Sequence, residues 1–164
     1  MHDTHSYIRT QATISAIINM IANPAISWLV NRDMQATPLT GVAVDTTITC
    51  LVMSTLIALF TTSALERALK SGSIKAHDDA PRAGMLSRLP HAWWALGPSL
   101  GFGFALVLVP LSVGFFALLG LSELPFRGFA VLKILYPGAM AFAVTRWVIV
   151  RQLQAAARLS SVPS

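Results

Sequence analysis

Long runs of apolar residues without a charged side chain dominate the hydropathy pattern. Three of them are uninterrupted and cover residues 10–31, 46–65 and 93–121. Because an α-helix rises 1.5 Å per residue, about twenty apolar residues cross the hydrocarbon core of a bilayer. The pattern therefore predicts three membrane-spanning helices, the third long enough to cross at a tilt.

A fourth apolar run, residues 128–145, contains Lys133 and is followed by Arg146 and Arg151. A lysine near one end of a span and arginines near the other can extend to the two interfaces, so this run is also interpreted as a span. The chain is thus predicted to be all-α, a single integral membrane four-helix bundle over residues 1–164. The expected spans are residues 8–30, 40–68, 93–121 and 127–150, with a loop at residues 69–92.

A signal peptide is the competing interpretation of the first run, since Arg9 precedes it. The run is longer than a signal-peptide core, contains Asn19 and Asn23, and lacks a convincing small-residue cleavage site. We therefore expect it to be retained as a span.

Composition supports a lipid environment. The chain has 12% charged and 54% hydrophobic residues, whereas a soluble domain carries about a quarter charged residues. The net charge of +5 comes from basic residues that flank the apolar runs, not from a polar stripe with interleaved aromatics, so nucleic acid is not an expected partner. The single cysteine, Cys50, excludes an intrachain disulfide and a cysteine-based metal site.

Orientation follows from the loops, because cytoplasmic loops carry an excess of lysine and arginine. The segment between the second and third spans is rich in basic residues, so it and both termini are expected on the cytoplasmic side. Trp93, Trp94 and Trp147 would then lie at the cytoplasmic interface and Trp28 at the outer one. The basic residues are Arg67, Lys70, Lys75, Arg82 and Arg88.

The segment Pro38–Val44 resembles Pro125–Val131, with four identities in seven positions. Each would open the second helix of a hairpin, and Met53 and Met140 fall in the same register. We therefore expect two tandem helical hairpins that run in the same direction, related by an axis along the membrane normal. The alternative is chance similarity, since Pro-x-x-Gly is a common turn and the alphabet of apolar helices is small.

The first span carries a polar residue at every fourth position. This spacing forms one ridge that winds slowly around the helix. Asn19 and Asn23 are its deepest members, and amides at that depth are expected to hydrogen-bond across to another helix. The ridge consists of Gln11, Ser15, Asn19, Asn23, Ser27 and Asn31.

Asp45 begins the second span and aligns, in the proposed repeat, with the neighbour of Lys133. An unpaired charge at that depth is costly. We therefore hypothesise an ion pair between Asp45 and Lys133, with Asn23 as a third member. Three roles stay open for this cluster: it fixes helix register, it forms a substrate or ion site, or it contacts lipid headgroups near the outer interface.

Small residues mark the last two spans. Gly97 and Gly101 form a Gly-x-x-x-Gly pair, and Ala139 and Ala143 form a similar pair beside Gly138. Such residues allow helix backbones to approach closely. Both packing within the chain and an oligomer interface are compatible with them.

Catalytic chemistry is not expected. The chain has no Gly-x-Ser-x-Gly elbow, Walker loop or His-Glu-x-x-His motif. Its histidines, His2, His5, His77 and His91, all lie outside the spans. No enzyme activity, metal or cofactor is therefore predicted.

Asn19 and Asn23, Trp28, Pro38-Leu39, Gly41, Asp45-Thr46 and Arg67-Ala68-Leu69 together resemble a group of small bacterial inner-membrane proteins loosely labelled as permeases. The resemblance covers mainly the first 70 residues. It implies four helices and a bacterial inner membrane, and it transfers no functional residues.

These features are compatible with two functions. The first is a non-enzymatic membrane protein that acts through helix packing, as an accessory subunit of a larger complex or as a homo-oligomer. The alternative is a small transporter or channel with a polar path along the first two spans. The expected partners are the lipid bilayer and other membrane protein subunits or further copies of this chain.

Overall fold

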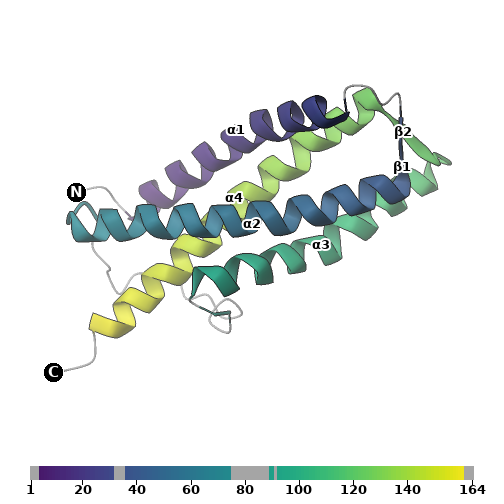
Figure 1. Cartoon of the computed structure of the whole chain (residues 1–164). Helices are drawn as coiled ribbons and strands as arrows, with labels where there is room; N and C mark the ends of the chain where they lie inside the picture. Colours follow the sequence, from purple (N-terminus) through teal and green to yellow (C-terminus); the bar gives the residue numbers. More distant parts are fainter. Residues whose placement is uncertain (1–3, 32–35, 75–88, 91, 161–164) are drawn as a thin grey trace.

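The computed structural model describes residues 4–31, 36–74, 89–90 and 92–160. Two helix–strand–helix units follow each other along the chain (Figure 1). In chain order the elements are α1 (Thr4–Asn31), β1 (Ala36–Pro38), α2 (Leu39–Lys70), α3 (Trp93–Leu118), β2 (Glu123–Pro125) and α4 (Phe126–Ser160).

Each of these four helices is long and apolar enough to cross a membrane. The predicted all-α class with four long helices is therefore confirmed for the described residues. α4 continues ten residues beyond the expected end of the fourth span, to Ser160. α3 instead ends at Leu118, because Gly120 adopts a φ of +71° and the amide of Leu121 turns back to the carbonyl of Phe116 at 3.1 Å.

The helices exchange partners between the two units (Figure 1). The first helix of each unit packs most extensively on the second helix of the other unit: α1 on α4, and α3 on α2. The two second helices, α2 and α4, also pack on each other. They form the centre of the bundle, and α1 and α3 lie outside them.

A short antiparallel pair of strands, β1 and β2, connects the units at one end of the bundle (Figure 1). Thr37 is paired with Leu124, and the proline that ends each strand directly precedes a helix. The first free amide of α2, at Leu39, donates to the carbonyl of Ser122 at 3.2 Å. This bond satisfies a donor that has no partner within the helix.

Three apolar clusters form the core. The largest lies where α2, α3 and α4 meet and contains Met53 and Met140. A second, with Leu65 and Ile149, joins the ends of α2 and α4 to the start of α1. The third surrounds Leu124 beside the strands. Buried apolar side chains therefore run the length of the bundle.

Glycines set the closest helix contacts. A Cβ added to Gly97 would lie 2.6 Å from the Cα of Thr55, and one added to Gly101 would lie 2.7 Å from the carbonyl oxygen of Cys50. The Gly-x-x-x-Gly pair therefore packs against the backbone of α2. Gly138 instead packs against the side chain of Met20 on α1.

Two of the small residues that were predicted to pack closely are less buried than Gly138. Ala139 is exposed and Ala143 is half-buried. These two residues therefore do not share the buried environment of Gly138.

Several predictions concern residues outside the described part of the chain. They include most of the basic loop and three of the four histidines. These residues are His2, Lys75, His77, Arg82, Arg88 and His91.

Candidate functional site

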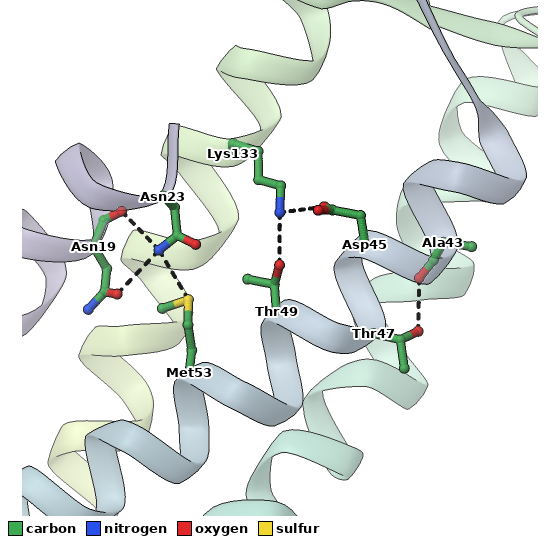
Figure 2. A network of polar contacts seen from close by, with 8 residues as sticks. All are labelled: Asn19, Asn23, Ala43, Asp45, Thr47, Thr49, Met53 and Lys133. Carbon is green, nitrogen blue, oxygen red and sulfur yellow. Dashed lines mark hydrogen bonds and ion pairs between the residues drawn. The ribbon is translucent and has the colours of Figure 1, made fainter. Parts of the chain in front are cut away.

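Asp45 and Lys133 form an ion pair between α2 and α4 (Figure 2). Lys133 Nζ also donates to Thr49 Oγ1 at 2.8 Å. Asp45 and Thr49 are four residues apart on α2, so their side chains lie on the same helix face. One face of α2 thus supplies both partners of the ammonium group.

The two charges of the pair differ in accessibility. The side chain of Lys133 is 4% exposed, whereas that of Asp45 is 33% exposed. The expectation that Lys133 extends to an interface is therefore wrong. The reason is that α2 and α4 are in contact. Lys133 lies on the face of α4 that packs on α2, so its ammonium group contacts the carboxylate of Asp45 and is shielded from water.

Aromatic rings flank the ammonium group. The ring centroid of Phe129 lies 5.6 Å from Lys133 Nζ, and that of Tyr136 lies 5.8 Å away. The faces of aromatic rings attract cations at such distances. Phe129 lies four residues before Lys133 on α4 and Tyr136 three residues after it, so both rings share its helix face. They exclude water from the ammonium group.

Further hydroxyl groups surround the pair. Those of Thr46 and Tyr136 are buried, and the Tyr136 hydroxyl lies close to the side chains of Thr46 and Thr49. Tyr136 was not among the predicted site residues, although its spacing of three residues from Lys133 places both on one helix face. The site can therefore offer hydroxyl donors as well as a carboxylate.

Asn19 and Asn23 form a separate polar group (Figure 2). Asn23 Nδ2 lies 3.2 Å from Asn19 Oδ1 and 3.1 Å from the Met53 sulfur on α2. Asn19 Nδ2 donates to the carbonyl of Ser15 at 2.8 Å. The structure thus gives Asn23 other partners than the pair of Asp45 and Lys133. Its contact across to α2 is with a thioether, which is a weak acceptor.

A cavity of about 320 Å³ lies between α1 and α2. Polar residues of the α1 ridge line one wall, and Thr61 of α2 and Thr145 of α4 add hydroxyls. Ile14, Ile18 and Phe60 at its edge are exposed, so the cavity reaches the surface. The ridge residues in its wall are Gln11, Ser15 and Asn19.

The chemical repertoire of these groups is narrow. Within the described ranges, no group of three or more His, Cys, Asp or Glu side chains is placed to hold a metal ion. The available groups are one paired carboxylate, amides and hydroxyls, which suit hydrogen bonding and charge pairing. No family model, curated protein or solved structure that was compared with the chain matches it.

Proposed function

We propose that the chain is an integral protein of a bacterial inner membrane, with four spans and both termini in the cytoplasm. The outer helices support insertion, because only 6% of the apolar window of α1 and 17% of that of α3 are buried by the protein. Arg9, Arg67, Lys70 and Arg146 lie toward the end where α1 begins and α2 and α4 end. That distribution supports a cytoplasmic assignment of this end.

We also propose that the two units are copies of one hairpin. Their elements coincide at an offset of 87 residues: α1 and α3 end at Asn31 and Leu118, and α2 and α4 begin at Leu39 and Phe126. Thr37 and Leu124, which face each other at the centre of the strand pair, are themselves 87 residues apart. In this proposal, a two-fold axis through the strand pair relates the contact of α1 with α4 to the contact of α3 with α2.

The protein acts, in this proposal, through helix packing within a larger membrane assembly or homo-oligomer. The observation that carries this proposal is the polar cavity between α1 and α2, which opens between exposed apolar side chains. Amides that face lipid are unfavourable, whereas a neighbouring helix can supply partners. The cavity is therefore suited to receive a polar residue of a further helix.

The arrangement of the polar groups favours packing over conduction. The cavity is lined by residues 11–19 of α1 and 57–64 of α2, together with Thr145. The ion pair lies elsewhere, near the start of α2, and Met53 contacts Asn23 between them. Two separate polar groups are better suited to fixing helix contacts than to forming one path.

Native mass spectrometry of gently solubilised membranes tests the proposal. A stoichiometric complex with another membrane protein, or a closed homo-oligomer, is expected for the natural chain. The variant Gln11→Leu removes a cavity amide that is not used within α1 and should release the partner. The control Thr13→Val changes an exposed polar residue of α1 outside the cavity and should leave the complex intact. A monomer without partner in the natural chain would contradict the proposal.

A small transporter is the second candidate, and the partial exposure of Asp45 is the observation that favours it. A carboxylate within a span that retains access to water can bind a proton or a cation. Proteoliposomes containing the full chain should then pass protons or sodium faster than empty liposomes, and Asp45→Asn should abolish the difference. Equal flux with and without the protein would exclude this candidate for these ions.

A further inference from the structure

A second cavity lies between α1 and α4, toward the end of the bundle where α1 begins. Its volume is about 300 Å³. Arg9 and His5 reach it from α1, and Arg146 reaches it from α4. The rest of its wall is apolar and consists of Ile8, Ala12, Phe142 and Val150.

The two arginines give this cavity positive charge that the described part of the chain does not neutralise. Of the described acids, Asp45 is paired with Lys133 near the opposite end and Glu123 lies in β2 at that end, whereas Glu66 of α2 lies at the same end as the cavity but does not line it. Neither arginine forms an ion pair with a described acidic residue. An anion from outside the chain would therefore find two guanidinium groups available.

The matching interface in the other half of the molecule differs. At the offset of 87 residues, Arg9 corresponds to Leu96 and Arg146 corresponds to Leu59. Leu96 is fully buried in the packing of α3 on α2. The cationic cavity is thus particular to α1 and α4 and does not follow from the common helix arrangement.

The position of the cavity suits a lipid headgroup. Arg9 is the sixth residue of α1, within two turns of its start. Arg9 and Arg146 are exposed, whereas Ile8 and Val150 are buried beneath them, and Phe142 extends the apolar wall toward the surface. The cavity therefore combines a charged opening with an apolar wall. The opening suits a lipid phosphate, and the wall suits the acyl chain beside it.

We propose that this cavity binds the phosphate group of an anionic glycerophospholipid from the cytoplasmic leaflet. Guanidinium groups match phosphate oxygens with paired hydrogen bonds. Basic pockets between membrane helices on the cytoplasmic side are recognised sites for anionic headgroups. The proposal rests on the membrane orientation proposed above and does not depend on a protein partner.

Native mass spectrometry of the full chain in a neutral detergent tests it. Dioleoyl phosphatidylglycerol and dioleoyl phosphatidylcholine are added separately, and the dissociation constant of the first bound lipid is measured. The natural chain should bind the anionic lipid at least about ten times more tightly. Arg9→Gln/Arg146→Gln should weaken that binding about twenty-five-fold, at about five-fold for each arginine. It should weaken the binding of phosphatidylcholine much less, because the charge of that phosphate is offset by its own choline group.

The matched control is Arg67→Gln/Lys70→Gln, which removes two positive charges at the same end of the bundle but outside the cavity. It should retain the preference. Arg9→Lys/Arg146→Lys keeps the charge but loses the paired hydrogen bonds, so it should retain only part of the preference. The helical circular dichroism of every variant should match that of the natural chain. Equal affinity of the natural chain for both lipids, or an equal loss in the control, would overturn the proposal.

Three further outcomes separate this proposal from others. Glycerol phosphate, which lacks acyl chains, should not displace the lipid at equal concentration; displacement would overturn the lipid assignment in favour of a free phosphate compound. If the chain fractionates with membranes but does not prefer the anionic lipid, the lipid site alone fails. Recovery of the chain in the soluble fraction would contradict the proposed function first.

Discussion

Lys133 is a charged residue that the bundle keeps almost entirely from water. Its ammonium group has Asp45 and Thr49 as partners and two aromatic rings as neighbours. A buried ion pair adds little net stability, because the loss of hydration offsets the attraction, but removal of one partner leaves a costly charge. The pair is therefore best understood as a constraint on how α2 and α4 align.

Replacement of Asp45 and replacement of Lys133 should lower the free energy of unfolding by different amounts. Asp45→Asn leaves a buried ammonium group without its counter-ion and should lower the free energy of unfolding by about 3 kcal/mol. Lys133→Met leaves a carboxylate that is one-third exposed and should cost about 1 kcal/mol. The double replacement should be tolerated better than Lys133→Met alone. Unfolding of the purified protein in detergent, followed by circular dichroism, measures all three.

Glu123→Gln provides the control for these variants, since it neutralises an exposed acid at the same end of the bundle. Its effect on the unfolding free energy should stay below about 1 kcal/mol. An equal loss of unfolding free energy in Lys133→Met and in the double replacement would mean that the pair does not couple α2 to α4.

At the scale of the elements, the contact of α3 with α2 depends on glycine. Gly101→Ala would place a methyl group 2.7 Å from a backbone oxygen of α2, so the two helices would have to separate. Overpacking of this kind costs about 1–3 kcal/mol. A lower unfolding temperature in detergent than that of the natural protein is the expected measurement.

The same substitution two residues later gives a matched control. Gly103 has open space where a Cβ would be, and alanine is the better helix former by about 1 kcal/mol. Gly103→Ala should therefore be neutral or stabilising. Equal losses from both substitutions would indicate that helix flexibility, and not close approach, explains the effect at Gly101.

The elements were predictable to different degrees. The four helices follow from the length of their apolar runs, which decides a span regardless of what the helix contacts. The strands β1 and β2 were not predicted, because segments of three residues that end in proline carry little strand signal. The burial of Lys133 and the position of Tyr136 beside it were not predictable, because both depend on the contact of α2 with α4.

The choice of helix partners was not predictable from the same pattern. Helices that are apolar around most of their surface give no single face that identifies a neighbour. The glycines of α3 indicated a close contact but not with which helix. Only the three-dimensional arrangement shows that α1 packs on α4 and α3 on α2.

At the scale of the whole molecule, the proposed four-span arrangement predicts opposite locations for the two kinds of connection. Reporter fusions at Gln35, between α1 and α2, and at Ala80, between α2 and α3, should report the periplasm and the cytoplasm respectively. An alkaline phosphatase and a fluorescent reporter, active on opposite sides, make the measurement. The same side for both positions would contradict four spans.

The exchange of helix partners makes each half of the molecule dependent on the other. A chain that ends after α2 would leave α1 without α4 and α2 without α3, the two most extensive interfaces of the fold. Each hairpin alone should therefore be unstable. The two hairpins expressed together should assemble, because every lost contact is restored between them.

Co-purification of the two halves tests this arrangement most directly. Residues 1–80 with an affinity tag and residues 81–164 without one are produced together and extracted in a mild detergent. We predict that they are recovered in equal amounts, and that the tagged half alone is degraded or aggregated. Recovery of the tagged half as a stable monomer that does not retain residues 81–164 would contradict the exchange of helices between the units.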